Sequence, residues 1–412
     1  MVDVAILGYG TVGSGVVEVL TTNKESINKK AGKKINLKYV LDLKDFKGDP
    51  IEEILTKDYD VILNDPDVKV IAEVMGGVEP AYTFVKKALL KNKSVVTSNK
   101  ELVARHGAEL LQIAKDRNIN FLFEASVGGG IPIIRPLNQS LTADEIYEIT
   151  GILNGTTNFI LSKMADEGLD FETVLKEAQD KGYAERNPEA DVEGYDACRK
   201  IAILSSLAFG MHVDFEDIYT EGITKITDID MAYAKELGYD IKLLATSKKQ
   251  DDKVYAMVSP IMIGKEHPLS NVNGVFNAIF VKGNVIGDVM FYGKGAGKLP
   301  TASAVVADMV DAVKHLETNI VSFWSTKKMK LTSVENISSR YFIRVASHSD
   351  RKVKDTINNI FGDVEYIKGN NKMQEVAFIT QADTEKTLSE KVNQIKNMES
   401  ISQVNSIIRI EK

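Results

Sequence analysis

A dense group of polar residues lies between positions 182 and 200 of the 412-residue sequence. Asp196 and Lys200 are four residues apart, so a helix beginning near Val192 would place them on one face. An acid and an amine so arranged can orient a polar substrate and transfer a proton, but the same pair is common on solvated helix surfaces. Asp191, just before this helix, is a candidate for its N-cap. The neighbouring elements therefore decide which chemistry is open to the group.

A glycine-rich turn follows the first apolar stretch of the chain. It consists of Gly8, Tyr9, Gly10, Thr11, Val12 and Gly13, a G-x-G-x-x-G motif that opens a helix. The first glycine permits a tight turn, the second lets the backbone approach a pyrophosphate, and the third lets the helix pack on the strand. The phosphates then bind the free N–H groups of the helix N-terminus. The motif predicts NAD or NADP binding, and the alternative is a glycine-rich turn in another kind of α/β protein.

The choice between the two cofactors stays open. Asp42 stands at the end of the second predicted strand, where an acid normally binds the ribose hydroxyls. It comes later than usual because a Lys- and Asn-rich insert occupies about 23–34. Asp42 favours NAD, whereas Lys44 favours the 2′-phosphate of NADP; a third alternative is that Asp42 merely faces solvent.

Residues 1–130 alternate short β-rich runs with helix-length segments, which predicts βαβ units and a Rossmann-type parallel sheet. The predicted strands are Val2–Leu7, Leu37–Leu41, Val61–Leu63, Val70–Val74, Ser94–Thr97 and Phe121–Glu124. A helix within 297–318 is expected to complete this dinucleotide-binding domain. The fold class is therefore α/β.

The remaining chain is expected to form a second and a third domain. Residues 131–296 predict an α+β substrate-binding and dimerisation domain with a largely antiparallel sheet. A polar linker over 319–338 follows. Residues 339–412 have the order strand, helix, strand, strand, helix, strand, which predicts a ferredoxin-like βαββαβ module.

Composition excludes several classes of protein. The formal net charge is −7, which argues against a general nucleic-acid or membrane-surface binder. Cys198 is the only cysteine, so an intrachain disulfide and a cysteine metal cluster are excluded. The five histidines are scattered without zinc-ligand spacing. With no visible secretion signal or apolar span, the chain is expected to be a soluble cytoplasmic protein.

Five longer stretches resemble homoserine dehydrogenase, in chain order, from residue 2 to about 316. They are VVTSNKELVA, FEASVGGGIP, GILNGTTNFIL, DKGYAERNPEADVEGYDACRK and YGKGAGKLPTASAVVAD. Several long motifs in register are far more specific than one glycine-rich turn. The family reduces L-aspartate 4-semialdehyde to L-homoserine with NAD(P)H, in the biosynthesis of threonine, methionine and isoleucine.

The resemblance implies roles for the polar group. Lys200 matches the proton donor, and Lys100 a second functional lysine at the nicotinamide and the reacting carbonyl. Glu185 would bind the substrate ammonium and Asp196 its polar end. The implied substrate pocket also includes Asp191, Tyr183, Gly182 and Thr156. We expect burial to lower the pKa of Lys200, with Asp196 acting in the opposite direction.

Two further loops gain roles from the resemblance. The other implied cofactor residues are Met75, Gly76, Ser98 and Gly297. The alternative for the loop at Gly297 is a plain helix start with Pro near the first turn. A structural sodium ion is implied at Glu124 and the carbonyls of Val127, Gly129 and Ile131. The residues alone are equally consistent with a cofactor-facing loop at 124–131.

The tail resembles an ACT domain, a module that often binds amino acids at a dimer interface. The turn after its first strand, Ser347 to Lys352, lacks the usual glycine, which puts threonine feedback in doubt. Because no aspartate-kinase region precedes residue 1, a monofunctional member is expected, as a homodimer or homotetramer. The alternatives are a dehydrogenase for another small amino or hydroxy acid, and a non-catalytic sensor that binds dinucleotide.

Overall fold

A six-stranded parallel sheet occupies the N-terminal part of the computed structural model, which describes residues 1–250, 253–321, 324–347, 350–367 and 375–411. The strand order is β3-β2-β1-β4-β5-β6. The strands are β1 (Val2–Leu7), β2 (Ile35–Leu41), β3 (Leu55–Thr56), β4 (Val68–Glu73), β5 (Ser94–Thr97) and β6 (Phe121–Leu122). Strand β1, almost entirely buried, pairs with β2 on one side and β4 on the other, which confirms the predicted Rossmann-type sheet.

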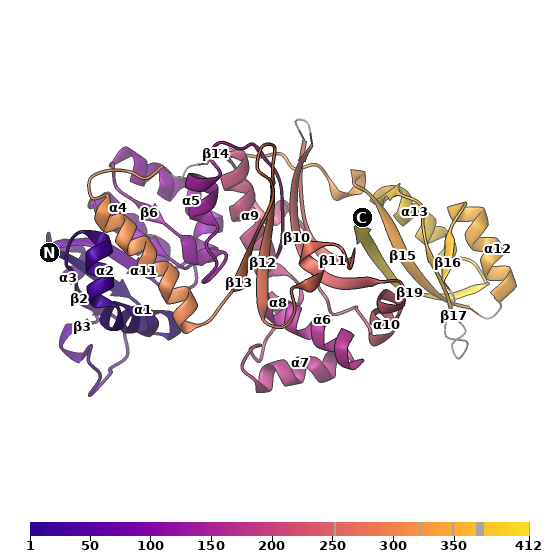
Figure 1. Cartoon of the computed structure of the whole chain (residues 1–412), viewed down its shortest axis with the longest axis horizontal. Helices are drawn as coiled ribbons and strands as arrows, with labels where there is room; N and C mark the ends of the chain where they lie inside the picture. Colours follow the sequence, from indigo (N-terminus) through magenta and orange to yellow (C-terminus); the bar gives the residue numbers. More distant parts are fainter. Residues whose placement is uncertain (251–252, 322–323, 348–349, 368–374, 412) are drawn as a thin grey trace. The chain divides into compact units, whose positions relative to one another are not determined.

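Helices from two distant parts of the chain cover this sheet. They are α1 (Thr11–Thr22), α2 (Lys24–Ala31), α3 (Tyr59–Asn64), α4 (Ala81–Leu90), α5 (Lys100–Asp116) and α11 (Lys298–Lys314). Figure 1 shows α11, in orange, beside the indigo helices α1 and α2. A shared apolar core joins Val16 and Leu20 of α1 to Val305 and Met309 of α11. Helix α11 therefore packs with α1 in one core, and the extent of the predicted dinucleotide-binding domain stays a prediction.

The predicted strand at Val61–Leu63 is wrong, because these residues lie in α3. Tyr59, Ile62 and Leu63 are the buried residues of this helix, at the i, i+3, i+4 spacing of a helical face. Asp58 caps the helix by accepting a hydrogen bond from the Asp60 backbone N–H. A short apolar run alone does not distinguish a strand from a helix.

The chain divides into two units, and the parallel sheet belongs to the first. Unit 1 comprises Met1–Gly155, Cys198–Ile218 and Phe276–Lys330. It also contains an antiparallel group, β7 (Ile146–Ile152), β12 (Phe276–Gly283) and β13 (Gly287–Lys294). In the stretch predicted as a linker, β14 (Ser325–Lys328) pairs with β8 (Met211–His212), and Trp324 is buried. Each unit combines segments from several of the predicted domains. The predicted domain boundaries stay a prediction.

Unit 2 comprises Thr156–Ala197, Tyr219–Val275 and Leu331–Lys412. Its helices before the tail are α6 (Gly155–Glu167), α7 (Phe171–Asp180), α8 (Glu189–Val192) and α10 (Asp228–Glu236), and α9 (Tyr195–Phe209) begins in this unit. The strands before the tail are β9 (Tyr219–Thr220), β10 (Tyr239–Gln250) and β11 (Lys253–Gly264). Strands β10 and β11 form a long antiparallel hairpin.

The tail has the predicted strand and helix order, with one further two-residue strand before its second helix. Its elements are β15 (Ser338–Ser347), α12 (Asp350–Phe361), β16 (Glu365–Ile367), β17 (Glu375–Ile379), β18 (Asp383–Thr384), α13 (Glu385–Lys396) and β19 (Ile401–Glu411). Positions 348–349, within the turn that departs from the ACT pattern, lie outside the described residues. Strand β19 pairs with β15 of the tail and also, in parallel, with β11. The tail therefore shares one sheet with the β10–β11 hairpin.

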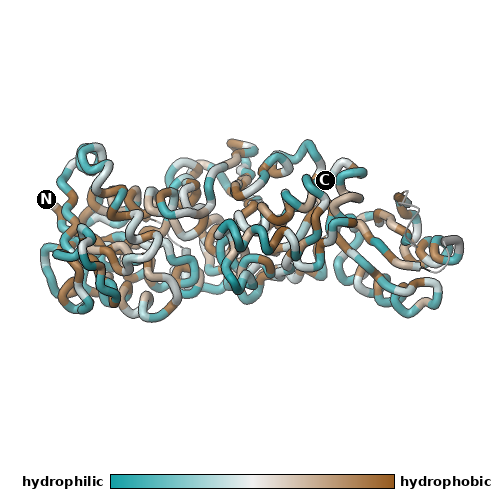
Figure 2. Tube along the Cα trace, turned by 90° about the horizontal axis from the view of Figure 1, so that it is seen from below, coloured by the Kyte–Doolittle hydropathy of each residue, from teal (hydrophilic) through white to brown (hydrophobic). Residues whose placement is uncertain are grey.

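Hydrophobic residues occur in short stretches throughout the chain. Figure 2 shows brown hydrophobic stretches that are repeatedly interrupted by teal hydrophilic ones. Within the described residues, no helix combines the length and the apolar character needed to cross a membrane.

One buried lysine gives the fold a testable pH dependence. Lys242 of β10 is 3% exposed, and its ammonium donates to the Val272 carbonyl at 2.8 Å and to the Asn273 Oδ1 at 2.7 Å. Burial lowers the pKa of Lys242 from 10.5 to about 8. Between these values the unfolded chain holds a proton that the folded chain lacks, so stability rises with pH.

We predict that the wild type gains about 3 kcal/mol of unfolding free energy, relative to Lys242→Met, between pH 8 and pH 10.5. Denaturant unfolding of both proteins across this range measures the difference. Lys176→Met, which alters an exposed lysine that does not contribute to the Lys242 shift, is the control and should give a flat difference. A difference between wild type and Lys242→Met that is independent of pH would contradict the prediction.

Candidate active site

The turn between β1 and α1 has the geometry of a pyrophosphate-binding turn. Gly8 has a φ of +98°, which glycine adopts readily, and a Cβ there would lie 3.0 Å from the Met75 Cγ. A Cβ at Gly13 would lie 2.0 Å from the Gly8 carbonyl oxygen, so only glycine permits this helix–strand contact. Gly10 is the N-cap of α1 and supplies no capping side chain. The backbone N–H groups that follow, at Thr11 and Val12, are therefore oriented for an anion.

Asp42 lies beside this turn, as predicted. Its carboxylate accepts hydrogen bonds from the Tyr9 N–H at 2.8 Å and the Lys44 N–H at 3.0 Å. The Tyr9 hydroxyl donates to Asp49 at 3.0 Å, and burial, together with that bond, raises the pKa of Tyr9 to about 12. Tyr9 and Asp49 thus fix the turn against the end of β2, a role that the sequence analysis missed. Asp42 contacts the glycine-rich turn rather than merely facing solvent.

Glu73, at the end of β4, connects the loop after β4 to the end of β5. Its buried carboxylate accepts from the Met75 N–H at 2.8 Å and from the Thr97 hydroxyl at 2.7 Å. Burial raises the pKa of Glu73. Asn99 adds a second link by donating to the Gly77 carbonyl and capping α5.

These contacts hold together four residues that the sequence predicted as cofactor contacts: Met75, Gly76, Ser98 and Lys100. Lys100 is the first residue of α5. Glu73 and Asn99 were not predicted as site residues. A buried acid at the end of a central parallel strand was the signal available for Glu73.

Lys200 is buried on α9, and its ammonium donates to the Leu153 carbonyl at 2.7 Å. The helix begins at Tyr195, so Asp196 lies in its first turn and Lys200 one turn later. Asp196 is buried as well, at 3% exposure, which rules out the solvated surface pair considered from the sequence. The predicted lowering of the Lys200 pKa stays a prediction.

The expected N-cap role of Asp191 is wrong. The helix predicted from Val192 is two helices, α8 and α9, separated at Gly194, which has a φ of +82°. Asp191 lies inside α8, and its carbonyl accepts from the Gly194 N–H at 3.0 Å. Asp191 is partly buried, which leaves it available as a pocket residue.

The other predicted substrate residues meet at a turn after α7. The Thr156 hydroxyl donates to the Tyr183 carbonyl at 2.7 Å, and the Tyr183 ring packs edge-on against Phe159. Gly182 has a φ of +72° and ends the preceding turn. Glu185 is exposed, so its carboxylate is accessible to a solute.

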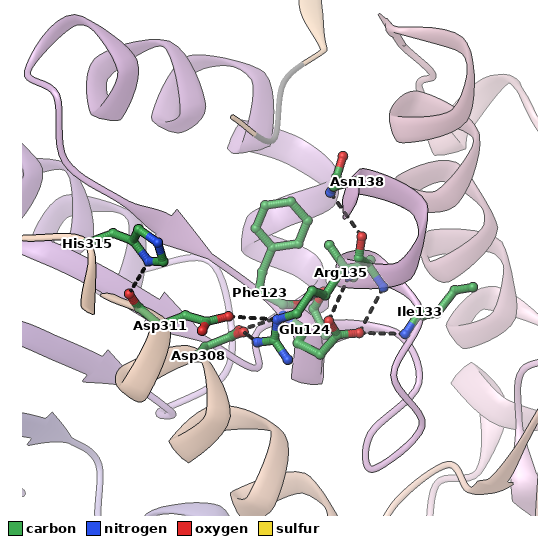
Figure 3. Close-up of polar contacts among 10 residues, drawn as sticks. Phe123, Glu124, Ile133, Arg135, Asn138, Asp308, Asp311 and His315 are labelled. Atoms are coloured by element: carbon green, nitrogen blue, oxygen red, sulfur yellow. Dashed lines mark hydrogen bonds and ion pairs between the residues drawn. The ribbon is translucent and has the colours of Figure 1, made fainter. Parts of the chain in front are cut away.

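The Glu124 carboxylate binds the backbone of the loop that follows it (Figure 3). One oxygen accepts from the Ile133 and Ile134 N–H groups at 2.6 and 2.8 Å, and the other from the Arg135 N–H at 2.8 Å. These three donors use three of the roughly four acceptor positions of the carboxylate. Elsewhere in the loop, Val127, Gly129 and Ile131 have carbonyls that accept no hydrogen bond among the described residues.

An ion cluster connects this loop to α11. Asp308 accepts from the Glu124 N–H at 2.8 Å and from the Arg135 guanidinium at 2.7 Å, and Asp311 pairs with the same guanidinium at 2.7 Å (Figure 3). Burial raises the pKa of Asp308 to about 8; the neighbouring Glu124 acts in the same direction and Arg135 opposes it. No local pattern predicted this cluster, because Asp308 and Arg135 are 173 positions apart in the chain.

The start of α11 touches both the loop and the nucleotide helix. Gly297 has a φ of +120° and is the N-cap of α11. A Cβ at Gly15 of α1 would lie 2.8 Å from the Lys298 carbonyl oxygen, and one at Gly130 would lie 2.8 Å from the Pro300 Cβ. The predicted cofactor residue Gly297 is thus held next to α1.

The structure therefore gathers the predicted cofactor residues, with Lys100 and Lys200, in unit 1, and the predicted substrate residues in unit 2. Helix α9 contributes Lys200 to unit 1 and Asp196 to unit 2. Among the residues that the structure describes, no three His, Cys, Asp or Glu side chains cluster as a metal site.

Two family models match the chain. The model described as "Homoserine dehydrogenase, NAD binding domain" matches residues 8–124, and the one described as "Homoserine dehydrogenase" matches residues 132–310. These ranges contain the glycine-rich turn and α9, respectively.

Curated relatives and solved structures agree with these matches. The homoserine dehydrogenase of Bacillus subtilis is 40% identical, over 100% of this chain and 98% of that protein. A crystal structure of a homoserine dehydrogenase from Thiobacillus denitrificans is 36% identical with a TM-score of 0.90, over 100% of this chain and 98% of its own. A hyperthermophilic archaeal homoserine dehydrogenase in complex with NADPH is 28% identical with a TM-score of 0.65, over 76% of this chain and 97% of its own. This chain belongs to the homoserine dehydrogenase family.

Proposed function

We propose that this protein interconverts L-homoserine and L-aspartate 4-semialdehyde by hydride transfer with NAD(P), within amino-acid biosynthesis. Full-length similarity to homoserine dehydrogenases supports the reaction. The observation that carries the proposal is Lys200, a buried ammonium fixed on a backbone carbonyl one helical turn from the buried Asp196. A sensor that only bound dinucleotide would not require this pair.

The dinucleotide fits the turn at Gly8–Gly13. When bound, the nicotinamide supplies the hydride acceptor or donor. The N-terminus of α1 would hold the pyrophosphate, because its N–H groups carry the positive end of the helix dipole. Asp42, held beside Tyr9, supports ribose binding and so favours NAD; Lys44 and the NADPH complex of the archaeal relative favour NADP.

In the proposed reduction, Lys200 donates a proton to the aldehyde oxygen while its charge stabilises the developing alkoxide. Lys100 acts beside it at the reacting carbonyl. Glu185 binds the substrate ammonium through its exposed carboxylate, and Asp191 and Asp196 bind the polar end of the substrate. Tyr183, Gly182 and Thr156 form the turn that shapes this pocket.

We further propose that a structural sodium ion binds the loop after Glu124. The acceptors would be the main-chain carbonyls of Val127, Gly129 and Ile131, with Glu124 contributing through its carbonyl while its carboxylate holds the loop. Hard oxygen ligands of this kind suit an alkali cation.

We expect a homodimer or homotetramer in the cytoplasm. Apolar side chains at the β12–β13 turn and along β13 support an interface: Val285 and Ile286 are 75% and 48% exposed, and Met290 and Tyr292 are 41% and 53% exposed.

Lys200→Ala should lower kcat about 10²- to 10⁴-fold, because the proton donor is lost. The measurement is the nicotinamide absorbance with L-homoserine and NAD⁺ or NADP⁺ in parallel, and the two wild-type rates decide cofactor preference. Lys265→Ala, at an exposed lysine, is the control and should keep wild-type activity. Absence of turnover with either nucleotide, despite nucleotide binding, would overturn the proposed reaction.

Sodium should raise the Tm relative to choline at equal ionic strength, by roughly 2–4 °C per kcal/mol of binding. Trp324, the only tryptophan, packs edge-on against Phe123, so its fluorescence should change over the same sodium titration. An identical Tm and identical Trp324 fluorescence in the two salts would contradict the proposed sodium site.

A further inference from the structure

Arg409 lies where the tail meets the rest of unit 2. It belongs to β19 and is the register partner of Ile261 on β11. Its side chain is 7% exposed, so the guanidinium is almost wholly withdrawn from water. A buried cation is costly unless it is paired and hydrogen-bonded, so its partners indicate what it holds in place.

The guanidinium bridges two carboxylates from opposite sides. It contacts Glu221 Oε2 at 2.8 Å and Glu385 Oε1 at 2.6 Å. Its central carbon lies 5.1 Å from the centre of the Tyr219 ring, within the range of a cation–π contact. Glu385 is the first residue of α13 and also accepts from the Tyr341 hydroxyl at 2.6 Å. Arg409 therefore ties the tail to the segment from Tyr219 to Glu221.

The residues that follow this segment form hydrogen bonds with the turn that carries Asp191. The Ile223 N–H donates to the Val192 carbonyl at 2.8 Å, and the Thr224 hydroxyl donates to the Glu193 carboxylate at 3.0 Å. A Cβ at Gly222 would lie 2.3 Å from the Val192 oxygen, so the two backbones touch.

The turn also packs on β11. A Cβ at Gly194 would lie 3.1 Å from the Val258 Cγ1, and the Glu221 N–H donates to the Val258 carbonyl at 2.8 Å. The Gly194 N–H closes the turn on the Asp191 carbonyl, and α9 begins at the next residue, Tyr195. A shift of Glu221 would therefore move the backbone between Asp191 and Asp196.

We propose that Arg409 is a positioning residue, which sets the place of Asp191 and Asp196 through Glu221 and the 220–224 segment. The proposal rests on the proposed function, in which these two aspartates bind the substrate. It assigns the tail an indirect part in homoserine binding, because β19 contributes the cation that fixes Glu221.

The alternative is that Arg409 only docks the tail. A docking residue would affect unfolding, whereas a positioning residue also changes the KM for homoserine and leaves kcat nearly unchanged. Arg344 is the matched control, because it is another buried arginine of the tail, 3% exposed, that pairs with Asp230 of α10 and with Glu375. Within the described residues, Arg344 forms no hydrogen bond or ion pair with Glu221 or the 191–194 turn.

The experiment compares Arg409→Met, Arg409→Lys, Glu221→Gln, the double variant Arg409→Met/Glu221→Gln, and Arg344→Met in the full-length protein. Arg409→Met and Glu221→Gln should each raise the homoserine KM about fivefold to tenfold, with kcat within about twofold of wild type. The double variant should be no worse than either single one, because both remove the same link. Arg409→Lys should recover part of the loss, and Arg344→Met should lower the Tm without changing the KM.

Two outcomes would overturn the proposal: an unchanged homoserine KM in folded Arg409→Met, or equal KM increases in Arg409→Met and Arg344→Met. Asp196→Asn in the same assay tests the underlying assignment separately. If Asp196→Asn binds homoserine like the wild type, the substrate-site assignment fails, whatever Arg409→Met shows.

Discussion

The Glu124 carboxylate fixes the chain where it leaves the parallel sheet. It lies shortly after β6 and binds three successive backbone N–H groups, while its own N–H donates to Asp308 of α11. A buried carboxylate with several donors is strongly oriented, and removing it would leave those N–H groups unpaired. The glycine-rich loop between Glu124 and Ile133 is therefore held at both ends, whatever ligand it binds.

Helix α11 extends this constraint to the nucleotide side. Its first turn touches Gly15 of α1, and Asp308, three turns further, touches the Glu124 loop. Helix α11 thus contacts both the helix that follows the glycine-rich turn and the loop after Glu124. In unit 2, Arg409 plays a comparable part, because one buried cation joins the tail to the segment beside Asp191.

Local sequence patterns predicted the structural features that are determined by residues close together in the sequence. The strand at Val2–Leu7, the glycine-rich turn and the order of elements in the tail were all predictable, because an apolar run such as Val4–Leu7, periodicity and turn chemistry are local signals. The α3 helix was missed because its apolar run is short, and the break at Gly194 because the pattern around it is helical. Contacts such as Glu73 with Thr97, or Arg409 with Glu221, join residues 24 and 188 positions apart, so no local pattern contains them.

The most direct test of the central claim follows the hydride itself. The protein is incubated with NAD⁺ or NADP⁺ and L-homoserine carrying deuterium on its alcohol carbon, and the reduced nucleotide is analysed by NMR. The account predicts one deuterium at the nicotinamide ring carbon that accepts the hydride, formed only when homoserine and protein are both present. Reduced nucleotide without deuterium, or deuterium transfer from other small hydroxy acids but not from homoserine, would contradict it.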